Sequence, residues 1–377
     1  MRVTFVLPDA TMAGGVRVVA IYAERLKRRG HTVTVVSTPP RPLGARQWAR
    51  TLVRQRRWPS PVTRGPSHLD DVDVEHHVID RHRPVTDADV PDADVVVATW
   101  WETAERVWRL GRSKGTKVYF LQHHETWGGP PDRVNATWRL PMHKVVISKW
   151  LMDIAVQQFG DRTASLVPNS VDLDQFRAAP RGKQPVPTVG TMYSTIHWKG
   201  TDICLRAVEI ARRDVPELCL VAFGHTPPSA DLPLPAGTEY VAHPPQDRIR
   251  ETYGRCDAWL YGSRSEGFGL PILEAMACRT PVIGTPAGAA PELIGPGGGT
   301  LVGYDDPNAM AQAIVKTCRL PDPQWRQVSD TAYATATSYT WDQAADRFES
   351  ALETAISASG RGGENISPPP VPACAVK

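Results

Sequence analysis

The stretch from Tyr261 to Ile294, which reads YGSRSEGFGLPILEAMACRTPVIGTPAGAAPELI, constrains the fold more than any other part of the chain. Before it, the apolar run 258–261 predicts a buried strand. A polar loop rich in glycine follows, then an apolar helix, and then a second short strand at 281–283. A strand, loop, helix and strand in this order predict a parallel α/β sheet.

One carboxylate, Glu274, lies inside the apolar helix. A buried charge without partners is costly, so Glu274 needs a partner. Helical side chains tilt toward the helix N-terminus, which lets Glu274 reach the loop 266–269. Gly267 and Gly269 in that loop permit close backbone approach, and free amides at a helix N-terminus bind anions.

These features allow two interpretations. A diphosphate on the loop amides, with a ribose diol on Glu274, would make this a nucleotide-sugar site. Alternatively, the loop only caps the helix and Glu274 pairs with a buried arginine.

The segments EGFGLPILEAM, PVI and GAAPELI together resemble the signature of glycosyltransferase family 4, whose members are retaining enzymes of the GT-B fold. Glu266 and Glu274 match the paired glutamates of that family, which are separated by seven residues. The resemblance covers roughly residues 1–350. It implies an α/β protein with two facing Rossmann-like domains, each built on a parallel sheet, and an interdomain cleft.

The same resemblance predicts the domain organisation. Residues 1–180 would bind the acceptor and residues 181–340 the nucleotide sugar, while a helix over 341–356 crosses back to the first domain. A chain of 377 residues is long enough for two such cores. Residues 357–377 are rich in Gly, Ser and Pro without a hydrophobic pattern, which predicts a disordered tail.

In the second domain the resemblance assigns Lys199 to the donor diphosphate, Glu266 to the donor-sugar hydroxyls and Glu274 to the ribose. The loop residues expected to contact the donor are Gly267, Phe268, Gly269 and Leu270. Taken alone, Lys199 could equally be a solvated lysine near a helix start.

Most family members also place a basic residue several positions before this lysine. This chain has none between Gly190 and Lys199, so His197 or Arg264 is expected to take its place.

The N-terminal half opens with a strand at 3–7, a turn containing Gly14 and Gly15, a helix, and a strand at 31–36. This βαβ unit lacks the G-x-G-x-x-G motif of dinucleotide-binding proteins, and no acidic residue ends its second strand, so NAD binding is not predicted. The resemblance implies instead that the amides of Gly14 and Gly15 face the donor phosphate or the acceptor.

A second polar turn, Gln122 to Trp127, follows the strand 118–121 and contains His123, His124 and Glu125. Groups just beyond strand C-termini line the ligand crevice of open α/β sheets. These side chains could bind sugar hydroxyls and stack on a pyranose ring. Either His123 or His124 matches the family's catalytic turn. A zinc site is disfavoured, because adjacent histidines rarely bind one ion and no third ligand is near.

Trp100 and Trp101 follow the preceding predicted strand and would open onto the same crevice. Exposed aromatic residues at a strand end suit an acceptor platform, and one of the two is expected to be core.

No metal site is predicted. Asp71-Val72-Asp73 imitates the Asp-x-Asp metal motif of the GT-A fold, but it lies among scattered aspartates typical of solvated loops. No cofactor is expected either, because the nucleotide sugar is a substrate.

The net charge of +3 gives no reason to expect nucleic-acid binding. Six cysteines without a CxxC pair indicate a reducing compartment, and the sequence shows neither a signal-peptide pattern nor an apolar run of membrane-spanning length. A cytoplasmic protein is therefore expected. Seven arginines and no acidic residue fall within Arg41–Arg64. This segment is either a solvated excursion or a peripheral contact with the inner face of the membrane.

The predicted reaction transfers a hexose or deoxyhexose, with retention, from a nucleoside-diphosphate sugar to a hydroxyl of a glycan, a lipid-linked acceptor or a small molecule. No carboxylate stands out as a nucleophile, which favours same-face displacement, as is inferred for the family. The alternatives are a sugar-nucleotide epimerase of the same fold and a non-catalytic partner subunit.

Overall fold

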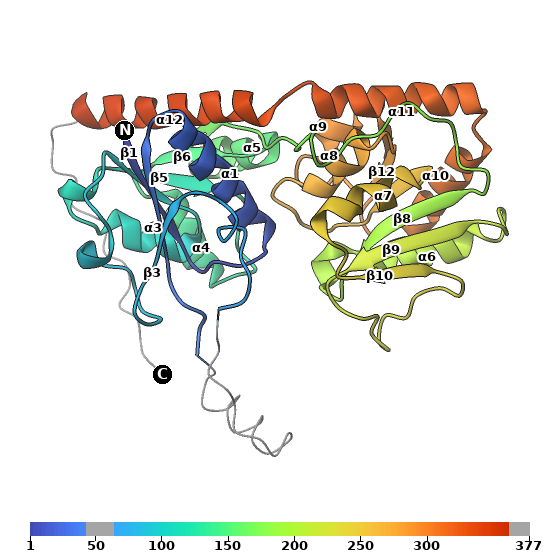
Figure 1. The fold of residues 1–377 in the computed structure, drawn as a ribbon, viewed down its shortest axis with the longest axis horizontal. Helices are drawn as coiled ribbons and strands as arrows, with labels where there is room; N and C mark the ends of the chain where they lie inside the picture. Colours follow the sequence, from blue (N-terminus) through green and yellow to red (C-terminus); the bar gives the residue numbers. More distant parts are fainter. Residues whose placement is uncertain (43–63, 362–377) are drawn as a thin grey trace, which may run out of the picture.

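The computed structural model describes residues 1–42 and 64–361, which form two α/β domains side by side (Figure 1). Each domain is built on one sheet whose strands pair in parallel, with helices packed against it. The predicted architecture of two Rossmann-like domains is confirmed.

In the described part of the first domain, seven strands form one sheet in the order β3-β2-β1-β4-β5-β6-β7. Its central strands are apolar and buried, as parallel strands covered on both faces must be. The strands are β1 Arg2–Leu7, β2 Thr32–Ser37, β3 Glu75–Val78, β4 Val95–Ala98, β5 Thr116–Leu121, β6 His143–Val146 and β7 Ser165–Leu166. The helices are α1 Gly14–Arg28, α3 Trp101–Trp108, α4 Pro131–Trp138 and α5 Lys149–Phe159.

The second domain contains a sheet of six strands in the order β10-β9-β8-β11-β12-β13. These strands are β8 Thr188–Tyr193, β9 Cys219–Gly224, β10 Glu239–Ala242, β11 Ala258–Tyr261, β12 Val282–Gly284 and β13 Gly299–Leu301. The helices are α6 Thr201–Ala211, α7 Ile249–Gly254, α8 Leu270–Ala277, α9 Ala290–Ile294, α10 Pro307–Arg319 and α11 Asp322–Thr337.

Both sheets reverse their strand order at a central pair, which is β1 and β4 in the first and β8 and β11 in the second. Ligands of open α/β sheets bind beyond the strand C-termini at such switch points. The segments that follow these four strands include Gly14, Trp100, Lys199 and Glu266. The topology therefore places these four predicted residues at the switch points of the two domains.

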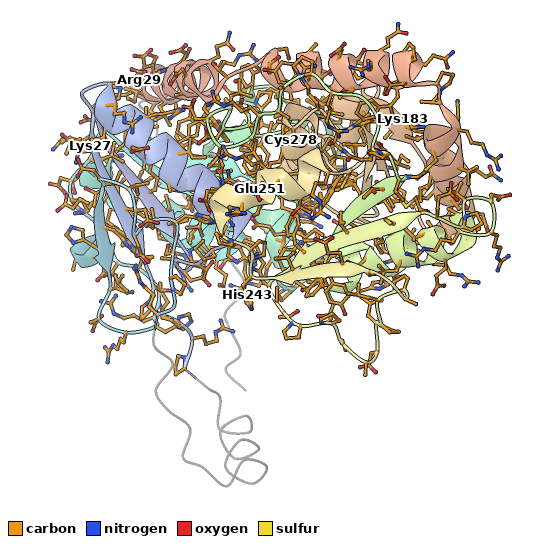
Figure 2. The ribbon with its side chains drawn as sticks, turned by 45° about the vertical axis from the view of Figure 1, so that its right-hand side comes forward. Lys27, Arg29, Lys183, His243, Glu251 and Cys278 are labelled. Atoms are coloured by element: carbon orange, nitrogen blue, oxygen red, sulfur yellow. The ribbon has the colours of Figure 1, made fainter. Side chains whose placement is uncertain are left out.

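The last helix, α12 Trp341–Arg361, follows α11 and runs along the first domain (Figure 1). Its Phe348 is fully buried and stacks on Tyr22 of α1, with ring centroids 4.4 Å apart. Arg29, which is labelled in Figure 2, follows α1 directly. It forms ion pairs with Asp346 and Glu349 of α12. The second domain is thereby tied to the first through a helix that belongs to the core of the first.

Residues 357–361 continue this helix, so the prediction that the disordered tail begins at 357 is wrong at its start. The remainder of that tail, 362–377, lies outside the described residues, as does most of the arginine-rich segment, of which Arg41 and Arg64 are described. Within the described ranges, no helix has both the length and the apolar character needed to cross a bilayer.

Candidate active site

The loop between β11 and α8 ends at Gly269, whose φ of +100° is strained for any residue with a side chain. A β-carbon at this position would also lie 2.7 Å from the Tyr261 hydroxyl. No side chain in the described part of the chain caps α8, and its first turn contains no acidic residue. The N-terminus of α8 therefore keeps the positive end of its dipole, as an anion site requires.

Glu274 lies on α8 and is only 8% exposed. The hydroxyl of Tyr253, on α7, donates a hydrogen bond of 2.8 Å to Glu274 Oε2. Arg17 Nη1, on α1 of the first domain, donates one of 2.8 Å to Glu274 Oε1. The buried Glu–Arg pair considered as an alternative from the sequence is therefore present, but its arginine comes from the other domain.

Glu266, the other member of the predicted glutamate pair, also holds a cation. Lys199 Nζ lies 2.6 Å from Glu266 Oε1, and the Ser263 hydroxyl donates to the same oxygen at 3.1 Å. Lys199 follows β8 in a short 3-10 turn, so both residues belong to the second domain. The predicted diphosphate lysine and sugar-binding glutamate are thus within contact distance of one another.

Arg264, one of the two residues expected to replace the missing basic group, is already engaged by two carboxylates. Arg264 donates to both carboxylate oxygens of Asp202, at 2.9 and 2.8 Å, and pairs with Asp305 at 2.6 Å. These hydrogen bonds raise the pKa of Arg264 above its ordinary value. His197 has an exposed side chain, while its carbonyl accepts a bond from Arg264.

The loop containing Gly267 touches the first domain directly. A β-carbon at Gly267 would lie 1.7 Å from the carbonyl oxygen of Gln122, and Ser148 Oγ donates to the Gly267 carbonyl at 2.9 Å. Gln122 Nε2 in turn donates to the carbonyl of Gly15 at 3.1 Å. The two predicted glycine turns, one in each domain, therefore lie on either side of Gln122.

The N-terminus of α1 resembles that of α8, since no described side chain caps it and its first turn lacks an acidic residue. A β-carbon at Gly14 would meet no atom within 4 Å, whereas one at Gly15 would lie 3.4 Å from the Gln122 amide group. Two positive helix ends, one from each domain, accordingly border the same region.

Of the two candidate histidines, His123 faces the second domain. Its Nε2 lies 3.3 Å from Ser265 Oγ, and its Nδ1 accepts a hydrogen bond of 3.3 Å from Trp127. Burial lowers the pKa of His123, with Glu266 acting in the opposite direction. The ring is therefore neutral at pH 7.

His124 points into the first domain, where its Nε2 lies 2.9 Å from Asn135 Oδ1 and its ring packs edge-on against Trp138. Glu125 is buried as well, and it accepts a bond of 2.7 Å from the Trp101 amide at the start of α3. Burial raises the pKa of Glu125 well above its ordinary value. The expectation that these two side chains line the site is corrected, since both support the first domain instead.

Aromatic side chains meet beside Lys199. Trp127 is 51% exposed and stacks on Trp198 of the other domain, with centroids 5.0 Å apart and an interplanar angle of 29°. Trp100 packs edge-on against Trp127 at 5.5 Å. Trp101 is buried. Trp101 is therefore the core member expected of this pair, while Trp100 packs against the exposed Trp127.

Among residues 1–42 and 64–361, no three His, Cys, Asp or Glu side chains cluster closely enough to hold a metal ion. Asp73 of the Asp-x-Asp segment pairs with Lys27, near the C-terminal end of α1, at 2.8 Å.

Sequence reasoning missed Arg17, Tyr253 and Trp198. A signal for Arg17 was available: a cation near the start of a helix opposes the helix dipole and so needs a specific partner. Nothing local marks Tyr253, whose role depends on the packing of α7 beside α8.

Comparison with known proteins adds a family match. A family model described as glycosyl transferases group 1 matches residues 184–319. The D-inositol 3-phosphate glycosyltransferase of Mycobacterium leprae (strain Br4923) is 31% identical over 209 residues, which are 49% of this chain and 48% of that protein. The lipopolysaccharide core biosynthesis mannosyltransferase LpcC of Rhizobium leguminosarum bv. viciae is 30% identical over 238 residues, 55% of this chain and 67% of the relative. The chain thus spans about half the length of the mycobacterial relative that it matches.

Solved structures show the same fold. The sucrose-phosphate synthase of Thermosynechococcus elongatus superposes with a TM-score of 0.71 at 16% identity, covering 95% of this chain and 100% of the other. Anabaena Alr3699/HepE, determined with UDP and glucose, gives a TM-score of 0.68 at 18% identity, covering 94% and 100%. The two facing domains therefore have the GT-B architecture.

Proposed function

The chain belongs to the glycosyl transferases group 1 family, and from this premise we propose that it transfers a sugar from a nucleoside-diphosphate sugar to an acceptor hydroxyl. The observation that carries the proposal is the pairing of Glu266 and Glu274 with two cations beside the uncapped N-terminus of α8. Carboxylates that can bind hydroxyls, next to positive groups that can bind phosphate, match the two chemical parts of such a donor.

In this proposal the donor ribose binds Glu274 and the donor sugar binds Glu266. The diphosphate lies against Lys199, the amides at the start of α8, and the amides of Gly14 and Gly15. The uncapped ends of α1 and α8 support this placement, because each offers backbone donors that no described side chain uses as a cap.

Transfer proceeds with retention, by displacement on one face of the sugar. The bond between the anomeric carbon and the phosphate oxygen breaks as the acceptor oxygen bonds to that carbon. The acceptor proton passes to the leaving phosphate oxygen. Lys199 and the two helix ends stabilise the charge that develops on the diphosphate, so the reaction requires no divalent metal.

The acceptor lies on the side of the first domain, against His123 and the aromatic group formed by Trp100, Trp127 and Trp198. The exposed ring of Trp127 offers a flat apolar face beside polar partners, which suits a sugar or another cyclic acceptor.

The test is incubation with UDP-, GDP- and dTDP-linked sugars, with detection of the released nucleoside diphosphate in the presence and absence of acceptors, and with or without EDTA. Release from at least one donor, unaffected by EDTA, is expected. Failure to cleave any donor would contradict the proposal. Turnover abolished by EDTA and restored by manganese would contradict its metal-independent mechanism.

A further inference from the structure

Arg17 occupies an unusual position, as the fourth residue of α1. A positive side chain so near a helix N-terminus is opposed by the helix dipole, and no acidic residue in the first turn compensates for it. Its ion-pair partner is Glu274, which is 257 positions away in the sequence and in the other domain. A favourable interaction of the guanidinium must therefore offset its unfavourable interaction with the helix dipole.

The guanidinium is held from several sides. Nη1 donates to Glu274 at 2.8 Å, Nη2 donates to Gln175 Oε1 at 3.0 Å, and the group lies 5.6 Å from the centre of the Phe176 ring. Gln175 in turn donates to the carbonyl of Gln246 at 2.8 Å. The side chain of Arg17 is 19% exposed, so its charge is only partly screened by water.

The two glutamates of the site thus hold one cation each, Lys199 on Glu266 and Arg17 on Glu274. Hydroxyl groups of a bound donor would compete with those cations for the carboxylate oxygens. A diphosphate would at the same time bring negative charge that both cations can neutralise. Binding then exchanges partners, so that neither carboxylate nor cation is left unpaired in a partly buried place.

We propose that Arg17 is the second cation of the diphosphate site. The inference rests on the proposed function and adds to it the group that supplies the charge missing before Lys199. Donor hydroxyls replace the guanidinium on Glu274, and the guanidinium turns to the diphosphate beside the amides of Gly14 and Gly15. Arg264 is less suited to this role, because two aspartates engage it and the proposed donor contacts displace neither of them.

The test compares nucleotides that differ by one phosphate. Calorimetric Kd values for UMP, UDP, GMP and GDP are measured on the wild-type protein, on Arg17→Gln and on Arg17→Lys. The ratio by which diphosphate binds more tightly than monophosphate is expected to fall about tenfold in Arg17→Gln. In Arg17→Lys, which keeps the charge, this ratio is expected to lie between those of Arg17→Gln and the wild type. The matched control is Arg28→Gln, on the exposed face of the same helix, and its ratio should equal that of the wild type.

An unchanged ratio in Arg17→Gln would overturn the inference and leave Arg17 as an interdomain contact only. Wild-type protein that binds neither UDP nor GDP and cleaves no UDP-, GDP- or dTDP-sugar would instead count against the proposed function itself. If Arg17→Gln fails to fold, labelling the arginines of the wild-type protein with phenylglyoxal tests whether Arg17 contacts the diphosphate. UDP or GDP should slow modification of Arg17, whereas the free nucleoside should not; equal labelling rates with both would overturn the inference.

Discussion

Burial lowers the pKa of the His123 imidazole below its ordinary value of 6.5, so the ring stays neutral through most of the range in which the enzyme would work. As the pH falls through the lowered pKa, the ring gains a proton, loses its acceptor for Trp127, and places a second charge near Lys199. Turnover should therefore decline on the acid side with an apparent pKa below 6.5. The measurement is kcat/KM from about pH 5 to about pH 8.

In His123→Gln this acid limb should disappear. His143→Gln is the matched control. Burial also lowers the pKa of His143, but this residue begins β6 and its ring forms a hydrogen bond with Ser165. An acid limb that persists in His123→Gln would show that another group controls the profile.

Reasoning from single residues singled out Glu274, because a carboxylate inside an apolar helix is an unusual local setting. Lys199 and Glu266 were assigned through the family resemblance instead, since neither stands out by itself. Sequence reasoning could not choose between His123 and His124, since adjacent side chains diverge and only tertiary packing decides which one faces the other domain. It assigned Glu125 to the site for a similar reason: a polar turn does not reveal that its carboxylate accepts a hydrogen bond from the first amide of a neighbouring helix.

At the scale of elements, the loop between β11 and α8 works through its backbone. Gly267→Ala would place a methyl group against the Gln122 carbonyl, and backbone atoms cannot yield as a flexible side chain can. We expect the interaction between the domains to weaken by about 1–3 kcal/mol and kcat/KM to fall about tenfold or more.

Gly254→Ala is the control, because a β-carbon at Gly254 would meet no atom within 4 Å and should leave kcat/KM unchanged. Wild-type turnover in Gly267→Ala would mean that the close approach of the two loops is not needed for catalysis.

The sequence predicted central strands such as β1 and β11 well, because they are largely apolar runs bounded by turn residues. It missed β7, β10 and β13, which are short and largely unburied outer strands. Their sequences contain little hydrophobic signal, and pairing with a neighbouring strand decides their conformation.

At the level of the whole molecule, α12 joins the two domains, because it follows α11 of the second domain and packs into the core of the first. Phe348→Ala would remove a fully buried ring packed between Phe5, Tyr22 and Phe120, at a cost of about 3–5 kcal/mol in the free energy of unfolding. Denaturant unfolding measures this loss, and Glu353→Ala, on the exposed side of α12, should cost little. A loss in Phe348→Ala no larger than in the control would contradict the assignment of α12 to the core of the first domain.

The relation between the domains was the least predictable feature. Paired glutamates in the sequence indicate what they could bind, but not that Arg17 would reach Glu274 from the other domain or that Trp127 would stack on Trp198. Such contacts depend on how two separately folded surfaces meet, and no local pattern encodes that arrangement.

The central claim is that Glu274 binds the ribose of a sugar nucleotide, and calorimetric titration of UDP- and GDP-sugars tests it most directly. Glu274→Gln keeps the shape and a partner for Arg17 but replaces one acceptor oxygen by a donor. Because charged hydrogen bonds contribute about 1.5–3 kcal/mol each, donor affinity should fall about tenfold to several hundredfold. Glu251→Gln, on the exposed side of α7, is the control and should bind as the wild type does (Figure 2). Equal donor affinity in Glu274→Gln and wild type, or no binding of any sugar nucleotide to the wild type, would contradict the account.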